Sequence, residues 1–244
     1  MLHLCHIALL AVLLGCGEDQ AMVKSRETVE HGILLSEEGK LAEAKAAFRK
    51  AIELDSTSAE AHFRLGYMYE IADSLADAAR EYATAIRLKP DMAVAHHNFG
   101  LLLAKGGDFE RAVREFELTI QLNAVDPDTI LAPMPYYCLG LIYSAQGKDE
   151  RAIEVHRKAI ELNPNLIFAH SELGEIYMKR GQLEAAEEVF KQALALKEDF
   201  VPAHYNLVTV YMRMKRPDAG AKHRKLFEKY RKTEPEEWQR FRGR

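Results

Sequence analysis

A period of 34 residues runs through this sequence and restricts the folds that are open to it. Gly32, Gly66 and Gly100 are 34 residues apart, and so are Gly140 and Gly174. The interval from Gly100 to Gly140 is 40 residues, so six extra residues lie between the third and fourth copies. A fixed period of this length is typical of proteins built from stacked repeats of one small helical or stranded unit.

The residues around each glycine recur as well. Each glycine is followed by a small residue 12 positions later, a large residue 16 positions later and a second small residue 19 positions later. The first small residues are Ala44, Ala78, Ala112, Ala152 and Ala186. The large residues are Phe48, Tyr82, Phe116, His156 and Phe190, and the second small residues are Ala51, Ala85, Thr119, Ala159 and Ala193.

This pattern resembles the tetratricopeptide repeat, a hairpin of two helices marked by Leu-Gly, Tyr, Ala, Phe and Pro at fixed positions. The resemblance implies an all-α fold, a right-handed superhelical solenoid of about six helix-turn-helix repeats. We place the repeats near residues 25–58, 59–92, 93–126, 133–166, 167–200 and 201–232, with an insertion at 127–132 and a C-terminal tail at 233–244. The sixth copy is degenerate, with Val208 where the glycine should be, and its basic second helix is typical of a solubilising cap.

The small residues of such a repeat are explained by how its two helices pack. Glycines such as Gly66 and alanines such as Ala78 allow the two helix backbones to approach closely. One hairpin cannot bury its apolar face alone, so hairpins stack. Pro127 and Pro133 forbid a continuous helix through the insertion, and we expect an extended loop there.

The N-terminus has the features of an export signal. Residues 1–15 contain no Lys, Arg, Asp or Glu, and the apolar run from Ile7 to Leu14 is too short to span a bilayer. The run ends in Leu13-Leu14-Gly15-Cys16, which resembles the lipobox of bacterial lipoproteins. The resemblance implies a signal peptide at 1–15, lipidation of Cys16 and a tether at 16–24. The same residues are also compatible with an ordinary secretory signal or a short uncleaved anchor.

Charge argues against nucleic acid as the partner, because the formal net charge is −4. Residues 213–232 are the exception, with nine Lys or Arg against Asp218 and Glu228. This stretch is either the solvated outer face of the last helix or a patch that meets anionic lipid headgroups or an acidic partner.

We expect no enzyme, cofactor or metal. No nucleophile elbow, P-loop, zinc-protease or dinucleotide motif occurs in a suitable context. His62, His96, His170 and His204 recur four positions before the glycine or its equivalent, but stacked units would hold them about 10 Å apart, too far to share one ion. Cys138 is interpreted as a buried structural thiol rather than a nucleophile.

Binding is expected on the first helices of the repeats, where tetratricopeptide proteins hold extended peptides. Counted from the glycines, the predicted groove residues are Phe63, Arg64, Tyr67, His97, Asn98, Leu101, Tyr137, Leu141, Phe168, Glu172, Glu175, Tyr205 and Asn206. Asn98 and Asn206 stand where some superhelices of this family carry an asparagine ladder that pairs with a bound peptide backbone. Each of these positions is also compatible with ordinary variable surface.

The sequence therefore predicts a protein-binding scaffold, lipid-anchored in a bacterial cell envelope and facing the periplasm, on the outer membrane in one version. A narrower hypothesis is a pilotin-type lipoprotein that assists assembly of a secretin or pilus. The sequence is also compatible with a glycan-binding or enzyme-accessory module and with a cytosolic scaffold, since a fold does not fix a function.

Overall fold

The computed structural model describes residues 20–123 and 132–232, and every regular element in these ranges is an α-helix. The chain divides into two compact units, with the division between Leu122 and Asn123 at the end of α7. The first unit contains α2 (Gln20–Glu37), α3 (Leu41–Leu54), α4 (Ala59–Ile71), α5 (Leu75–Leu88), α6 (Ala93–Lys105) and α7 (Phe109–Asn123). The second contains α8 (Pro133–Ala145), α9 (Asp149–Leu162), α10 (Ile167–Lys179), α11 (Leu183–Leu196), α12 (Val201–Arg213) and α13 (Pro217–Tyr230).

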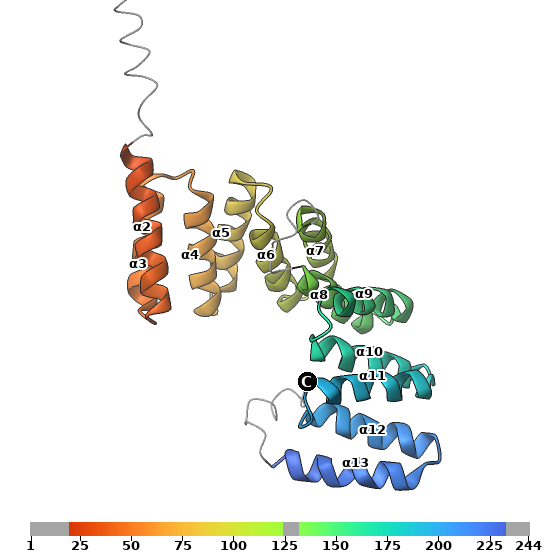
Figure 1. Cartoon of the computed structure of the whole chain (residues 1–244). Helices are drawn as coiled ribbons and strands as arrows, with labels where there is room; N and C mark the ends of the chain where they lie inside the picture. Colours follow the sequence, from red (N-terminus) through yellow and green to blue (C-terminus); the bar gives the residue numbers. More distant parts are fainter. Residues whose placement is uncertain (1–19, 124–131, 233–244) are drawn as a thin grey trace, which may run out of the picture. The chain divides into compact units, whose positions relative to one another are not determined.

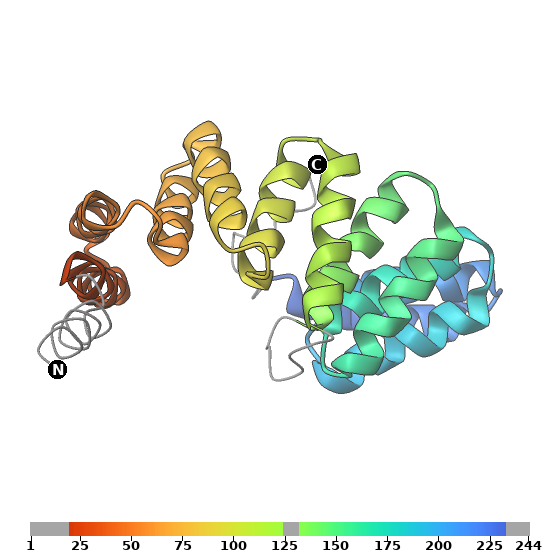
Figure 2. The same cartoon turned by 90° about the horizontal axis from the view of Figure 1, so that it is seen from above.

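Consecutive helices pack as antiparallel hairpins, and the hairpins of one unit lie side by side in sequence order (Figure 1). In the first unit the pair α2 and α3 is followed by α4 and α5, then by α6 and α7, as the second view also shows (Figure 2). In the second unit α10 contacts both α8 and α12, so the first helices of successive hairpins are direct neighbours there. The predicted fold class, an all-α array of helix-turn-helix repeats, is confirmed.

The core of each of the first five hairpins contains the contact between its glycine and the large residue 16 positions later. A Cβ added to Gly66 would lie 2.8 Å from the Tyr82 ring, and one added to Gly174 would lie 2.6 Å from the Phe190 ring. Both rings are completely buried. Only glycine leaves room for an aromatic ring at this depth, because heavy atoms pack no closer than van der Waals contact allows.

The five alanines after the glycines have no exposed surface, and the same holds for the large and small residues that follow them in each repeat. These positions alternate with exposed ones along the second helices, which is the amphipathic pattern of a helix packed on one side. The repeat-packing residues are therefore the interior of the hairpins.

The last hairpin shows why the sixth copy tolerates Val208. Its second helix carries Gly220 at the place of the alanines and the exposed Arg224 at the place of the buried ring. Since no ring presses on position 208, a valine fits there. In α13, Gly220 is the one buried residue, as expected for a helix that ends a stack.

Turns inside the hairpins place one residue in the left-handed region, seven positions after the glycine. Gly39, Gly107, Gly147 and Gly181 have φ between 69° and 81°, while the second and sixth hairpins use Asp73 and Lys215 there. Glycine adopts this conformation without strain, and aspartate does so more readily than lysine. These turn glycines are a second periodic signal in the sequence.

Candidate functional site

The predicted groove residues lie on the first helices α4, α6, α8, α10 and α12, but not all of them reach the surface. Phe63, His97 and Asn206 are buried. The half-buried members are Arg64, Asn98, Tyr137 and Glu172, and the exposed ones are Tyr67, Leu101, Leu141, Phe168, Glu175 and Tyr205. The accessible set is thus smaller than the predicted set, because Phe63 and His97 pack on the core rings of their hairpins and Asn206 bonds to Glu175.

In the first unit, two predicted residues pack inward against the core rings. The Phe63 ring lies 5.8 Å from the Tyr82 ring, and the His97 ring lies 5.6 Å from the Phe116 ring, measured between centroids. Burial lowers the pKa of His97 to about 4, so this imidazole is neutral at pH 7. Phe63 and His97 therefore support the surface rather than contact a ligand.

The remaining residues of this region form what we call the first-unit face: Arg64, Tyr67, Asn98 and Leu101. Arg64 donates to Glu60 one turn earlier at 2.6 Å, so its charge is already paired. Asn98 interacts with the hydroxyl of Tyr82, which in turn donates to Glu70 at 2.6 Å. Burial and the Glu70 contact raise the pKa of Tyr82. The first-unit face is consequently aromatic, amide-bearing and nearly neutral.

The corresponding second-unit face consists of Tyr137, Leu141, Phe168, Glu172, Glu175 and Tyr205. Glu172 is half-buried, and burial together with the charge of Glu175 raises its pKa to about 7. Asn206 donates to Glu175 at 3.0 Å, which links α12 to α10. Burial, with the charges of Glu172 and Glu175, also raises the pKa of Tyr137. This face combines two carboxylates with large apolar side chains.

The two asparagines therefore have partners within the chain. Asn206 contacts Glu175 and Asn98 contacts Tyr82. Each amide retains further hydrogen-bonding capacity, since an asparagine side chain offers two donors and two acceptor lone pairs. A ladder along a bound backbone would have to use that remaining capacity.

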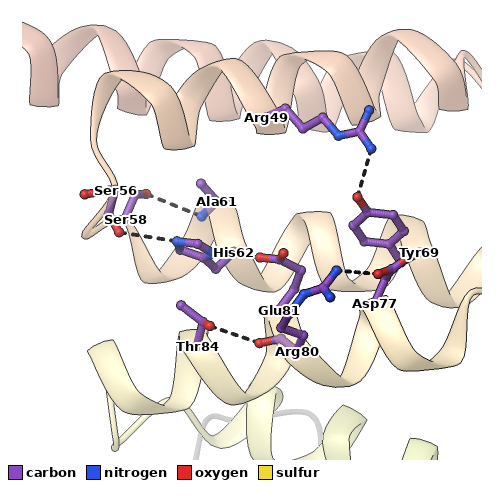
Figure 3. A network of polar contacts seen from close by, with 10 residues as sticks. All are labelled: Arg49, Ser56, Ser58, Ala61, His62, Tyr69, Asp77, Arg80, Glu81 and Thr84. Carbon is purple, nitrogen blue, oxygen red and sulfur yellow. Dashed lines mark hydrogen bonds and ion pairs between the residues drawn. The ribbon is translucent and has the colours of Figure 1, made fainter.

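The recurring histidines have a structural role that their spacing does not reveal. Nε2 of His62, His96, His170 and His204 lies 2.8–3.3 Å from a backbone carbonyl six residues earlier, in the preceding turn. Nδ1 of His62 and of His96 lies 2.7 Å from a glutamate 19 residues later, as the first of these sites illustrates (Figure 3). The hydrogen bond with Glu115 raises the pKa of His96. Each of these histidines thus ties its first helix to the chain before it.

A metal site would need several such side chains around one ion. Within residues 20–123 and 132–232 no group of three His, Cys, Asp or Glu side chains is arranged to hold an ion. Two histidines do approach each other at the last hairpin, where Nδ1 of His204 lies 3.0 Å from Nδ1 of His223. Burial and the neighbouring His204 lower the pKa of His223 to about 4.

Two buried residues, Cys138 and His156, are of types that can act as reactive groups. Cys138 is buried, and burial raises the pKa of its thiol to about 12, so it stays protonated and is a poor nucleophile. His156 replaces the core ring of the fourth hairpin, is fully buried, and has no hydrogen-bond partner at either ring nitrogen. Its pKa is lowered to about 4 by burial.

The lipidation site Cys16, the signal and most of the tether lie outside the described residues, as do positions 124–131 of the insertion and the tail 233–244. In the described ranges, none of the helices combines the length and apolar character that crossing a membrane requires. The basic stretch 213–232 falls on the end of α12 and on α13, where most Lys and Arg side chains are exposed.

Comparison with known proteins addresses the family directly. A family model described as TPR repeat matches residues 140–181 and 174–215, and one described as Tetratricopeptide repeat matches residues 29–93. Together they cover more than half of the chain. Among proteins with curated functions, none matches the sequence.

Solved structures agree on the fold. PilF of Pseudomonas aeruginosa superposes with a TM-score of 0.74 at 20% identity, over 92% of this chain and 99% of that one. PilW, described as a widely conserved type IV pilus biogenesis factor, gives 0.68 at 18% identity, over 82% and 90%. YrrB, described as a TPR protein with an unusual peptide-binding site, gives 0.61 at 22% identity, over 73% and 89%.

At 18–22% identity, the similarity to these solved structures shows a shared fold only. The family models match the sequence of this chain, and its helices pack as the hairpins that this family has. The chain therefore belongs to the tetratricopeptide repeat family, whose members typically act as non-enzymatic scaffolds that bind other proteins or peptides.

Proposed function

We propose that this chain is a membrane-tethered adaptor that binds an extended segment of a partner protein on the first helices of its repeats. The observation that carries the proposal is that each unit exposes large apolar side chains on its first helices. Tyr67, Leu101, Leu141, Phe168 and Tyr205 each keep more than a third of their surface exposed. Aromatic and aliphatic anchors of this kind supply much of the binding energy in protein interfaces.

The tether is the second part of the proposal. The sequence Leu13-Leu14-Gly15-Cys16 supports a lipid anchor at Cys16. A multiply acylated cysteine would hold the repeats stably at a membrane surface, whereas a single chain would bind only marginally. Labelling cells with a palmitate analogue tests this point, because incorporation should be lost in the Cys16→Ser variant. Labelling that persists in the variant would contradict lipidation at this residue.

The pathway proposed first is assembly of a type IV pilus or a secretin, in a bacterial envelope. The support is architectural: PilW is described as a type IV pilus biogenesis factor, and PilF superposes over almost its whole length. A deletion strain should lose secretin multimers from its outer membrane if this pathway is correct. Unchanged multimers would remove the pathway and leave the adaptor role in place.

Partner binding is tested by affinity capture from detergent-solubilised envelopes. The wild-type chain is compared with the triple variant Tyr67→Ala, Asn98→Ala and Tyr137→Ala. The matched control is Leu118→Ala, Leu162→Ala and Leu196→Ala, which removes exposed apolar side chains from second helices instead. A partner retained by the control and lost by the face variant supports the proposal. Identical capture by all three proteins would contradict it.

A further inference from the structure

The second-unit face carries two carboxylates that no cationic side chain of the described residues pairs with. Glu172 and Glu175 lie within one turn of α10, and among the described residues no Lys or Arg forms an ion pair with either. Other acidic side chains of this unit do have such pairs, as Asp149 has with Lys179, Glu150 with Arg180, and Glu187 with Lys191 and Arg216. A cationic group would therefore gain a charge interaction on this face that the described residues do not supply.

Apolar side chains surround the two carboxylates. Phe168 lies one turn before Glu172 on α10, Leu141 comes from α8, and Tyr205 comes from α12. The Tyr205 side chain is more than half exposed, and its ring packs on Phe227 of α13 with ring centroids 5.7 Å apart. The chemistry that complements this face is a chain with arginine or lysine next to aromatic residues.

Residues 238–244 of the same chain have that chemistry. They read Trp-Gln-Arg-Phe-Arg-Gly-Arg and contain no acidic residue. They follow α13, whose last residue lies at the start of α12: the Tyr230 hydroxyl donates to Glu198 at 3.3 Å, and its ring stacks on His204 at 5.6 Å. The chain thus leaves α13 beside Tyr205 and the second-unit face.

The reach of the tail is sufficient. Twelve residues follow position 232, and an extended chain spans about 3.3 Å per residue, so the tail extends up to about 40 Å. Packed helices are about 10 Å apart, so α10 and α8 are both within this distance of α12. The length of the tail and the position where it leaves α13 are both compatible with contact to Glu172.

We propose that residues 238–244 dock on the second-unit face, with arginine side chains at Glu172 and Glu175 and an aromatic ring beside Phe168 and Tyr205. The docked tail occupies the surface that the proposed function assigns to a partner segment, so a partner for this face must displace it. The competition rests on the proposed function, whereas the docking itself does not.

Trp238 is the only tryptophan in the chain, so its fluorescence reports on the tail of the full-length protein without a label. Quenching by acrylamide is measured for the full chain, for the double variant Glu172→Gln with Glu175→Gln, and for a synthetic peptide of residues 233–244. The matched control is Glu154→Gln with Glu184→Gln, which removes two exposed carboxylates from the second helices α9 and α11.

Docking predicts that Trp238 is protected in the full chain and in the control variant, and that the Glu172/Glu175 double variant shifts toward the free peptide. Loss of two partly exposed charge pairs weakens docking about fivefold. Circular dichroism confirms that both double variants keep their helices.

Two results would overturn the docking. In one, Trp238 is as accessible in the full chain as in the free peptide. In the other, it is protected equally in both double variants, which would place the tail elsewhere or on another macromolecule. Protection of Trp238 without capture of any partner would leave the docking in place and count against the proposed function alone.

Discussion

The first-unit face and the second-unit face are built on hairpins of the same kind, but they differ in charge. In the first unit, Arg64 forms an ion pair with Glu60, so the face carries almost no net charge. In the second unit, Glu172 and Glu175 stand without a cation among the described residues. The repeat pattern therefore fixes the residues that pack inside each hairpin. It leaves the charge of the exposed positions near the glycine on the first helix free to differ between repeats.

The two units also differ in one core position. Three hairpins of the first unit place Phe48, Tyr82 and Phe116 against the glycine, whereas the second unit begins with His156. Both ring nitrogens of His156 are buried without a partner. A buried polar group without a hydrogen bond costs stability, so the core of the fourth hairpin should be weaker than it would be with an aromatic ring.

The largest expected effect tests what the units share. Gly66→Ala in the first unit and Gly174→Ala in the second would each drive a Cβ into a buried ring, and we expect each to lower the free energy of unfolding by about 2–3 kcal/mol. Urea denaturation measures this. Gly220→Ala is the control, because its Cβ would meet nothing closer than 3.5 Å and should be neutral or slightly stabilising. A large cost in one unit only would show that the two cores are not equivalent.

The next effect tests the core difference. His156→Phe restores the ring of the other hairpins and should raise the free energy of unfolding by about 1–2 kcal/mol at pH 7. Its folded pKa of about 4 lies below the ordinary 6.5, so the unfolded chain binds the extra proton as the pH falls.

The stability linked to neutral His156 is therefore full above about pH 6.5 and is lost between about pH 6.5 and 4. The advantage of His156→Phe should grow across that window, by about 3 kcal/mol at its acidic end. Thermal melts at several pH values would show it. His31→Gln, at an exposed histidine, should leave the pH profile unchanged. A constant difference between wild type and His156→Phe would contradict the assignment.

A smaller effect compares the recurring histidines. His96 bonds to the Pro90 carbonyl and to Glu115, whereas His170 bonds to the Pro164 carbonyl and has Val189 where the glutamate would be. His96→Phe should cost about 1–2 kcal/mol and His170→Phe about half as much. Chemical denaturation of the two variants ranks them, and the reverse order would mean that the carboxylate contact contributes little.

The smallest effect sharpens the contrast between the faces. Glu172, with Glu175, Tyr137 and Asn206 around it, has a pKa of about 7 that arises first from burial. Arginine binding requires the ionised carboxylate, whose fraction rises from about a tenth at pH 6 to about nine tenths at pH 8. Protection of Trp238 from acrylamide should therefore increase over this range, and Glu172→Gln should flatten the profile. An unaltered slope in that variant would assign the dependence to another group.

The sequence was sufficient for the fold because each hairpin repeats the same local constraints. Gly66, Ala78 and Tyr82 recur in register in other copies, and the packing that they imply is local to one hairpin. The pairing of His62 with Glu81 escaped prediction because those residues are 19 positions apart on different helices, although the interval recurs at His96 and Glu115.

The site was predicted less completely. Spacing from the glycine placed the predicted residues on the first helices, yet it did not separate exposed Tyr67 from buried Phe63, which are one helical turn apart. Phe63 is buried against the ring of Tyr82, and this contact is a property of packing rather than of position in the sequence. The raised pKa of Glu172 likewise depends on burial by neighbouring helices.

The sparse packing of α13 has a consequence for how this molecule opens. In a stack where each hairpin contacts mainly its neighbours, native-state unfolding begins at the end with the least buried surface. In α13 only Gly220 is buried, so this helix has little buried surface to lose by fraying. Detachment of α13 would uncover the side of Tyr205 that packs on Phe227. A ligand that prefers either arrangement would thereby also set how often the final helix is formed.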